Sequence, residues 1–493
     1  MERDNNVFFD PSSLTETPGI RQRADAAFLQ NALGDPDLKV TSVSVNETGV
    51  YKRPLGKITG LPPYVEVRLR HRTGVHEENL IVWSPLCWND RFMGTGGGGT
   101  GTGGAQYITC PDNTSRGQTL PKAILNGFTA ATTDAGNGKR QWAVENGVFD
   151  RERYENWRSR STHRMTVIGK RVAEILHERP VRFSYFHGGS GGGRQAMVEA
   201  QEWPADYDGI WASCPAINWT KFLPEGYWPL AVMNDAGQIL SAKKLSLFSQ
   251  AARDAAGGDE AFYRLTEPAA FDPFTLVGTH GVTQTEAEIV RDIWRGPVDE
   301  NGERLWYGFR PGVPFWNVGI PIGAFYYQLL TGKPRPFFLS THHLRWVRED
   351  EKAASYGMTV AEYRDFFRQS VTKLADAAAD RADLSAFRDR GGKLLIDHGT
   401  CDPLIPVDGT LDYHRKLCLI MGGKNAVDRF CRVYITPGDG HGDCRWHAPG
   451  LTEQVGMAAL LAWVEHGEAP GELRTVQVDR RGHTLRESTI KAI

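Results

Sequence analysis

One stretch of the chain, residues 181–215, constrains the fold more than any other. It begins with the apolar and aromatic run VRFSYF (181–186), passes through HGGSGGG into the helix-like RQAMVEAQEW, and ends in a second apolar run, DGIWASCP (208–215). A strand, a sharp turn, a helix and a second strand in this order are typical of a parallel sheet with helices on its faces. This stretch therefore predicts an α/β fold.

The same pattern returns near the C-terminal end. GGKLLID (391–397) and CRVYITP (431–437) are strand-like, and helix-like stretches follow each of them. Between about residues 221 and 385, strands are hard to find, and helix-like runs rich in aromatic residues dominate. We therefore expect an α/β core made of residues 1–220 and 386–493, split by an inserted lid domain, residues 221–385.

The composition excludes some classes of partner and cofactor. The 493 residues are 40% hydrophobic, with a formal net charge of -2, so we expect no nucleic acid and no membrane as a partner. No run approaches the roughly 18 apolar residues of a transmembrane helix. The start, MERDNNVFFDPSSL, lacks the apolar stretch of a secretory signal, and the seven cysteines form no CxxC pair. The sequence thus predicts a cytoplasmic protein without a zinc site or a disulfide framework.

Ser190 is the candidate nucleophile. Residues 188–192 read GGSGG and satisfy the pattern G-x-S-x-G. A strand-to-helix turn that projects a hydroxyl needs strained backbone angles, and glycines let neighbouring chain approach. The alternative is a structural or phosphate-binding turn, because glycine-rich turns are common. The flanking strand and helix favour a catalytic serine.

A nucleophilic serine needs a base and a group that orients the base. Asp402 lies in HGTCDPLIP, after one late strand, and His441 lies in PGDGHGD, after the next. The order Ser, acid, His, with the last two on loops after late strands, is typical of α/β-hydrolases. We therefore predict Asp402 as the acid and His441 as the base.

Other residues compete for these roles. Asp397 sits at the end of its strand, and Asp408 is explained as a helix N-cap. His398 and His447 are alternatives to His441, each more typical of an ordinary loop histidine. His187, beside the serine turn, is interpreted as a packed or solvent-bonded residue.

The tract GTGGGGTGTGG (94–104) follows a strand early in the chain. Glycines let backbone N–H groups point into a cavity, which suits a second oxyanion-hole donor. The alternative is a flexible linker. Its place directly after an early strand favours the oxyanion hole.

Several segments together resemble the tannase/feruloyl esterase family of α/β-hydrolases, over roughly residues 60–470. They are WNDRFMGTGGGGTGT, ATTDAGN, the run from YFHGGSGGGRQ to CPAINW, DLSAFRDRGGKLLIDHGTCDPLIP and PGDGHGD. The resemblance implies an α/β-hydrolase core with a lid, and hydrolysis of esters of aromatic acids such as gallates, ferulates or terephthalates. It implies Ser190, Asp402 and His441 as the triad, with oxyanion donors from Gly191 and from Gly97 or Gly98.

The chain also departs from the family pattern. Members carry disulfide-bonded cysteines where this chain has Gly189 and Gly442, so no disulfide ties the catalytic loops. The lid stretch RDAAGGDEAFYRLTEP (253–268) has too few carboxylates for the family's calcium site. We expect no metal and no organic cofactor.

The aromatic residues of the lid are candidates for substrate contact. Tyr227, Trp316, Phe325 and Trp346 can line a slot for a flat acyl group of a small-molecule ester. The alternative is that they form the core of the lid. Two other functions stay open: hydrolysis of another acyl bond, in a thioester, an amide or a polyester fragment, and ligand binding without catalysis.

Overall fold

The computed structural model describes residues 7–52, 56–99, 119–137, 143–315, 336–441, 448–479 and 483–493. Its centre is a nine-stranded sheet in the order β1-β4-β5-β7-β6-β10-β11-β12-β13. The predicted α/β fold is confirmed. The strands are β1 (Leu38–Asn46), β4 (Tyr64–Thr73), β5 (His76–Pro85), β7 (Thr129–Thr133), β6 (Arg91–Thr95), β10 (Phe183–Gly189), β11 (Gly209–Ser213), β12 (Lys393–Gly399) and β13 (Cys431–Thr436).

The direction of the strands decides where loops meet. From β7 through β6, β10, β11 and β12 to β13, every neighbouring pair is parallel, whereas β1, β4 and β5 are antiparallel to their neighbours. In the register, Gly189 pairs with Ser213, and Ser213 pairs with Asp397. The carboxyl ends of the parallel strands therefore lie side by side at one edge, where ligands bind in open α/β sheets.

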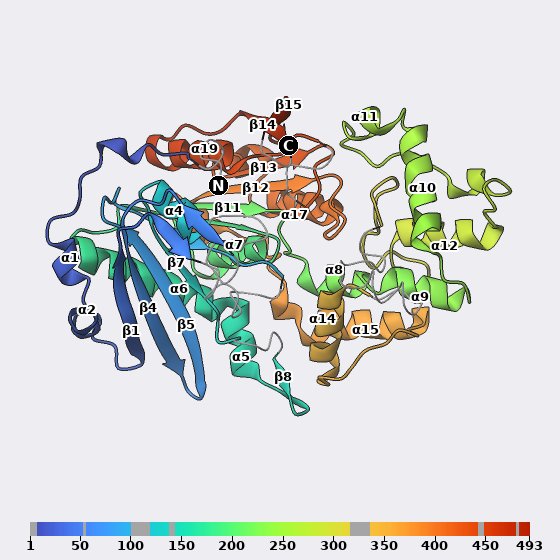
Figure 1. Cartoon of the computed structure of the whole chain (residues 1–493). Helices are drawn as coiled ribbons and strands as arrows, with labels where there is room; N and C mark the ends of the chain where they lie inside the picture. The colour runs from blue at the N-terminus through green and yellow to red at the C-terminus, as the bar shows by residue number, and fades with distance from the viewer. Residues whose placement is uncertain are drawn as a thin grey trace.

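Helices cover both faces of the sheet because successive strand residues point to opposite sides. On β10 and β11, Phe186 and Ile210 belong to one apolar core, and Tyr185 and Trp211 belong to the other. The first core also holds side chains from α2 (Ala26–Leu33), α6 (Ser161–His177), α7 (Gly191–Glu202) and α17 (Val407–Ile420), and the second holds side chains from α4 (Leu120–Leu125) and α19 (Glu453–His466). Figure 1 shows these helices around the sheet.

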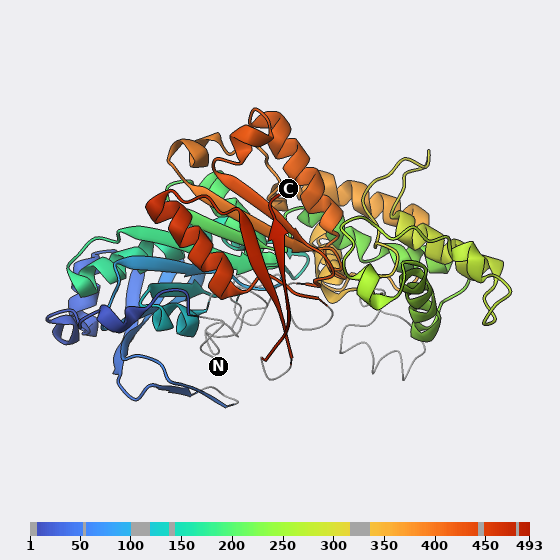
Figure 2. The same ribbon diagram turned by 90° about the horizontal axis from the view of Figure 1, so that it is seen from above.

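The described residues between β11 and β12 add no strand to the sheet. We call α8 to α15 the helical region; it lies beside the sheet, on the right in Figure 1 and again in the view from above in Figure 2. Its helices are α8 (Trp219–Glu225), α9 (Trp228–Asp235), α10 (Ala242–Ala255), α11 (Asp259–Phe262), α12 (Gln284–Arg295), α14 (Phe338–Arg348) and α15 (Val360–Lys373). The exact division into core and lid stays a prediction.

Several shorter α-helices and strand pairs lie outside the nine-stranded sheet and the helical region. These are α1 (Ile20–Arg23), α5 (Arg151–Glu155), α16 (Ser385–Asp389), α18 (Lys424–Val427), and the strand pairs β2 (Val50–Lys52) with β3 (Lys57–Thr59), β8 (Val144–Glu145) with β9 (Val148–Phe149), and β14 (Glu472–Val478) with β15 (Thr484–Lys491).

The buried side chain of Arg194, in α7, bonds to the chain just after α15 and to the chain just before α6. Arg194 is only 1% exposed; its Nε donates to the carbonyl of Ala377 at 2.7 Å, and its Nη1 donates to the carbonyl of Arg158 at 3.0 Å. The guanidinium also lies over the ring of Trp157, 4.3 Å from its centroid. Burial lowers the pKa of Arg194 to about 10, so the side chain stays charged at neutral pH.

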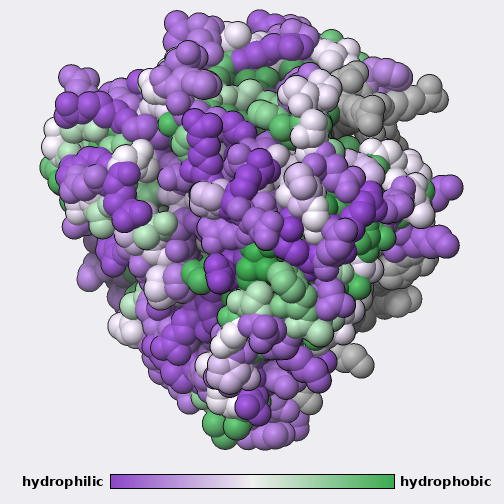
Figure 3. Space-filling view, turned by 90° about the vertical axis from the view of Figure 1, so that its left-hand side faces the viewer, coloured by the Kyte–Doolittle hydropathy of each residue, from purple (hydrophilic) through white to green (hydrophobic). Residues whose placement is uncertain are grey.

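The face of the molecule shown in Figure 3 is mostly hydrophilic. Hydrophobic residues gather there in small, separate groups, which is ordinary for a protein surface. Among the described residues, no helix is both long enough and apolar enough to span a membrane.

Candidate active site

Ser190 occupies the turn between β10 and α7, where its backbone has φ 61° and ψ -123°. A residue other than glycine adopts a positive φ only at a cost, so the surrounding chain must hold it there. The N–H of Ser190 donates to the carbonyl of Ser213 at 2.9 Å, and the N–H of Ala216 donates to the carbonyl of Ser190 at 3.1 Å. The end of β11 thus fixes the strained turn.

The glycines around Ser190 are required by close packing of backbone on backbone. A Cβ on Gly188 would lie 2.5 Å from the carbonyl oxygen of Gly192, and a Cβ on Gly191 would overlap the carbonyl oxygen of Gly99. A Cβ on Gly96 would lie 2.8 Å from Cα of Gly192. Residues 96–99 therefore pack against the serine turn, which does not fit a flexible linker; the rest of the glycine tract lies outside the described residues.

The predicted oxyanion donors differ in their surroundings. The N–H of Gly97 donates to Oε1 of Gln195 at 2.8 Å, so this group is engaged within the protein. Gly191 is the first residue of α7, where N–H groups have no carbonyl partner inside the helix and the helix dipole is positive. Gly191 is therefore the better placed of the predicted donors, and the second donor, Gly97 or Gly98, stays a prediction. The sequence gives no local signal for this contact of Gln195, because its partner, Gly97, lies 98 residues away.

Asp402 and His441 lie in the loops that follow β12 and β13, and they are hydrogen-bonded to each other. The distance from His441 Nδ1 to Asp402 Oδ2 is 2.7 Å. Other bonds hold the two loops together: the N–H of Gly438 donates to Oγ1 of Thr400 at 2.8 Å, and the N–H of Cys401 donates to the carbonyl of Asp439 at 3.0 Å. The structure thus brings the predicted acid and the predicted base into contact.

The buried Asp402 carboxylate is surrounded by hydrogen-bond donors. Its Oδ1 accepts from the N–H groups of Leu404 at 2.7 Å and Ile405 at 3.0 Å. Its Oδ2 accepts from His441 and also from Nε2 of His398, at 3.0 Å. Burial by itself would raise the pKa of Asp402, but the charge of His441 and the hydrogen bonds from both histidines lower the pKa well below its usual value. The carboxylate therefore stays ionised.

Besides Asp402, His441 has a second neighbour, the thiol of Cys214. Cys214 follows directly after β11; it is buried, has φ 36°, and its Sγ lies 3.9 Å from the carbonyl oxygen of His441. Burial lowers the pKa of His441, but the Asp402 carboxylate and the Cys214 sulfur raise it, and the net pKa lies well above the usual 6.5. Cys214 was not predicted, although its place at the end of a strand beside Ser190 is visible in the sequence.

Among the described residues, no hydrogen bond joins Ser190 to His441. The two residues lie at the same carboxyl edge of the sheet, with β11 and β12 between their strands: Ser190 follows β10, and His441 lies in the loop after β13. The hydrogen bond between nucleophile and base is often loose without substrate and tightens in the Michaelis complex.

The competing residues have other partners. His398, one alternative base, is fully buried and binds Oγ1 of Thr410 through Nδ1 at 2.8 Å, in addition to Asp402. Asp397, one alternative acid, accepts from Nε1 of Trp211 at 2.7 Å and from Oγ of Ser213 at 2.6 Å. Both side chains therefore support the site from within rather than face substrate.

The remaining alternatives are accounted for by packing and ion pairing. Asp408 forms a bidentate ion pair with Arg310, at 2.9 Å for each contact; the predicted N-cap role is wrong, because Pro406 occupies the N-cap position of α17 and Asp408 lies within its first turn. His187 is buried and stacks on Trp211 with ring centroids 3.8 Å apart, as expected for a packed residue. His447 lies outside the described residues.

The aromatic candidates of the lid fall into two groups. Tyr227 is 0% exposed and Trp346 is 2% exposed, and both belong to the apolar core of the helical region. Trp346 packs edge-on against Trp157, with centroids 4.8 Å apart. Their burial supports the alternative role in the core. Trp316 and Phe325 lie outside the described residues.

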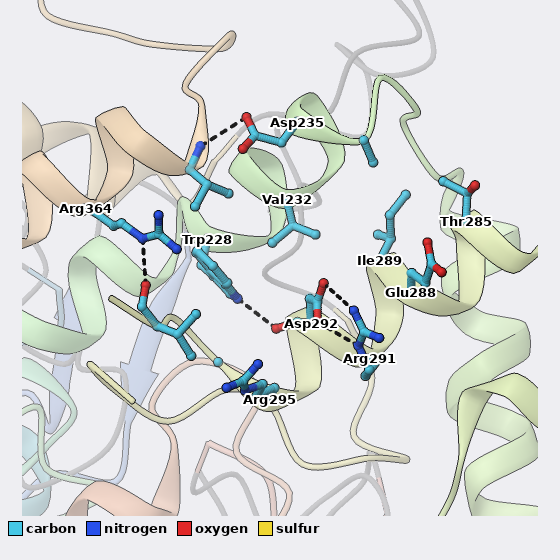
Figure 4. Close-up of a pocket in the computed structure, with 14 residues that line it drawn as sticks. Trp228, Val232, Asp235, Thr285, Glu288, Ile289, Arg291, Asp292, Arg295 and Arg364 are labelled. Atoms are coloured by element: carbon cyan, nitrogen blue, oxygen red, sulfur yellow. Dashed lines mark hydrogen bonds and ion pairs between the residues drawn. The ribbon is translucent and has the colours of Figure 1, made fainter. Parts of the chain in front are cut away.

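A separate cavity of about 360 Å³ lies between α9, α12 and α15 (Figure 4). Two arginines on its lining are engaged: Nε of Arg364 donates to the carbonyl of Val298 at 2.9 Å, and Arg291 pairs with Asp292 at 2.8 Å. Ser190, Asp402 and His441 are not among its lining residues, so we assign no catalytic role to it. Its apolar lining includes Trp228, Val232 and Ile289.

Comparison with protein families and with curated relatives gives a consistent result. The family model described as tannase and feruloyl esterase matches residues 75–490. A probable feruloyl esterase of Arthroderma benhamiae is 33% identical over 453 residues, which cover 85% of this chain and 79% of the relative. An uncharacterized esterase of Xanthomonas campestris is 26% identical over 491 residues, covering 89% of this chain and 82% of the relative.

Solved structures share the fold. Feruloyl esterase B from Aspergillus oryzae superimposes with a TM-score of 0.79 at 19% identity, covering 96% of this chain and 95% of that chain. Tannin acyl hydrolase from Aspergillus niger gives a TM-score of 0.76 at 18% identity, covering 97% and 93%. This chain therefore belongs to the tannase and feruloyl esterase family and is a carboxylic ester hydrolase with an α/β-hydrolase fold.

Proposed function

We propose that this enzyme hydrolyses esters of aromatic carboxylic acids through an acyl-enzyme formed on Ser190. The observation that carries the proposal is the 2.7 Å hydrogen bond between His441 and Asp402, at the sheet edge where Ser190 sits in its strained turn. A base held by a buried carboxylate, at the sheet edge that also carries a serine in a strained turn, is what acyl transfer through a serine requires.

In the acylation step, the Ser190 hydroxyl attacks the ester carbonyl while His441 accepts its proton. Asp402 holds the imidazole in one tautomer and stabilises the imidazolium that forms. An N–H group of Gly191 and one from the early glycine tract, Gly97 or Gly98, stabilise the tetrahedral oxyanion, and each such donor is worth on the order of 10²–10³ in rate. The intermediate collapses, and the alcohol leaves with the proton from His441.

In the second step, water repeats the chemistry. His441 takes a proton from the water as its oxygen attacks the acyl-enzyme, and a second oxyanion forms at the same donors. Its collapse frees the acid and returns the proton to Ser190. These steps use only the chain's own residues.

The proposed acyl group is aromatic because of the named relatives. One is called a probable feruloyl esterase and one solved structure is a tannin acyl hydrolase; ferulate and gallate are both aromatic acids. A terephthalate monoester belongs to the same chemical class. Hydrolysis of a thioester, an amide or a polyester fragment is the second candidate, since the same acyl-enzyme chemistry applies to each.

A panel of substrates tests the proposal. We expect the purified enzyme to cleave ferulate, gallate or terephthalate esters with a higher kcat/KM than the matching aliphatic esters, amides or thioesters. A higher kcat/KM for aliphatic esters, amides or thioesters would contradict the aromatic ester as the substrate class and would identify the preferred acyl bond instead.

A second measurement tests the nucleophile. Ser190→Ala should lower kcat on p-nitrophenyl esters by about 10⁶, the scale seen when a catalytic serine is lost, with nearly the same melting temperature. A fluorophosphonate probe should label Ser190 in the folded native enzyme. If Ser190 stays unlabelled, the chain is a ligand-binding homologue or uses another nucleophile.

A further inference from the structure

The thiol of Cys214 lies close enough to the candidate base and acid to form a metal site with them. One donor atom from each of Cys214, Asp402 and His441 lies within 4.8 Å of the other two. The three residues reach this point from separate segments, after β11, β12 and β13. They are the one group of this kind among the residues that the structure describes.

We propose that Cys214, Asp402 and His441 bind a thiophilic divalent cation, Zn²⁺, and that the bound ion inhibits the esterase. A thiolate, an imidazole and a carboxylate are the ligand types that zinc takes in proteins, and three protein ligands with an open fourth position are common. The inhibitory half of this proposal rests on the proposed function; the binding half does not.

The geometry needs only a small adjustment. Tetrahedral zinc with usual bond lengths places its donor atoms about 3.3–3.6 Å apart. The bonded atoms of Asp402 and His441, 2.7 Å apart, must separate by about 0.6–0.9 Å, and Cys214 must approach by at most about 1.5 Å from the 4.8 Å limit. Asp402 is held by the N–H groups of Leu404 and Ile405 through Oδ1 and by His398 through Oδ2, so the carboxylate keeps its orientation toward His441.

Binding removes the function of the base. A neutral imidazole has one lone pair, and an ion bound to it occupies that pair whichever ring nitrogen binds. His441 then has no lone pair to accept the proton of Ser190. The Cys214 thiol loses its proton to solvent when it becomes a ligand, so affinity for the ion falls as the pH is lowered. Hard cations such as Mg²⁺ and Ca²⁺ prefer oxygen ligands and bind poorly to this set.

Cobalt binding to the inactive variant tests the site without using activity. We expect Ser190→Ala protein, freed of metal, to bind one equivalent of Co²⁺ with a thiolate-to-cobalt charge-transfer band, and Zn²⁺ to displace it. In the same background, Cys214→Ser should lose the band. Cys214→Gly is a second variant, since glycine suits the positive φ at this position. Circular dichroism melts show that each variant is folded.

Cys431 provides the matched control. It is also buried, at 1% exposure, but it begins β13, at the opposite end of the strand from the His441 loop. Cys431→Ser should keep the band at full intensity. No band in Ser190→Ala, or a band that survives in folded Cys214→Ser or Cys214→Gly, would overturn the proposed site.

Inhibition is measured in the chain that retains Ser190. Zn²⁺ should lower kcat reversibly, EDTA should restore it, and Cys214→Ser should need at least about tenfold more Zn²⁺ for half-inhibition, because loss of even an outer-shell partner of a metal ligand costs about 10–100-fold in affinity. The two proposals fail separately. Cobalt binding in a protein without esterase activity would contradict the function, and esterase activity without cobalt binding would contradict the metal site.

Discussion

His398 donates a hydrogen bond of 3.0 Å to Oδ2 of Asp402, the same oxygen that binds His441. The other ring nitrogen of His398 is held by Thr410, so the imidazole has a fixed orientation deep in the protein. His398 is therefore a positioning residue: it touches the acid, and the acid touches the base.

Replacing His398 should lower kcat more than it changes KM. Loss of a hydrogen bond to a charged group costs about 1.5–3 kcal/mol, or roughly ten- to a hundredfold in rate if the cost appears in the transition state. His398→Leu removes the donor, whereas His398→Gln keeps an N–H in a similar place. Steady-state kinetics should give the order native, Gln, Leu. Equal activity of the two variants at equal melting temperature would show that this hydrogen bond does not position Asp402.

The rate should depend on the protonation of His441. Its pKa is raised above 6.5 by Asp402 and Cys214 despite burial. The base works only when neutral, so kcat/KM should rise with pH and level off above a midpoint higher than 6.5. A midpoint at or below 6.5 in a pH–rate profile would contradict this environment for His441.

The same pKa shifts both stabilise the folded state, but their contributions depend on pH in opposite ways. The raised pKa of His441 adds stability that is present below pH 6.5 and is lost as the pH rises through the raised value. The lowered pKa of Asp402 adds stability that is present above its ordinary value of 3.8 and is lost as the pH falls through the lowered value. Melting temperatures of native and His441→Ala protein across this range measure the contribution of the pair, because the variant removes the partner on which both shifts depend.

A thiol reductant should leave activity unchanged. The cysteines that the structure describes (Cys87, Cys214, Cys401, Cys418 and Cys431) are all free thiols, and Gly189 stands where family members are expected to carry a bonded cysteine. Hydrolysis should proceed at the same rate with and without the reductant. Strong inactivation would reveal a disulfide that braces the catalytic loops.

Loss of the Arg194 guanidinium should lower the free energy of unfolding far more than loss of an exposed arginine. Arg194→Met leaves the carbonyls of Ala377 and Arg158 without their buried donor, at a cost of about 2–4 kcal/mol in the free energy of unfolding. The control is Arg368→Met, which removes an exposed ion pair with Glu300 and should leave the free energy of unfolding nearly unchanged, because solvent screens such a pair. Urea unfolding measures the free energy of unfolding of both variants. Similar losses of stability would show that the buried hydrogen bonds of Arg194 contribute no more than an exposed ion pair.

Much of this arrangement could be predicted because it depends on local pattern. Alternating apolar runs around Ser190 predict parallel strands, and parallel strands bring their carboxyl ends together. The loops with Asp402 and His441 follow the last two strands of the sheet, so their convergence needs no knowledge of side-chain packing. The cytoplasmic location rests on the sequence alone and stays a prediction.

The rest depended on contacts between distant residues. The N–H of Gly97 looks available in the sequence, but the structure pairs it with Gln195. The sequence does not decide whether Tyr227 lines a pocket or lies in the core, because burial of an aromatic side chain depends on its neighbours. In the structure its ring packs against Phe366, with ring centroids 5.8 Å apart. His398 and Cys214 were visible as residues, but their partners become apparent only in three dimensions.

The contact between residues 96–99 and the turn at Ser190 restricts how such an enzyme can change. A methyl group at Gly191 would meet the carbonyl of Gly99 and push the two segments apart, and one at Gly188 would meet the carbonyl of Gly192 within the serine turn itself. New substrate preferences must therefore come from elsewhere, and a mutagenesis library should leave both glycine segments untouched and randomise the residues between β11 and β12.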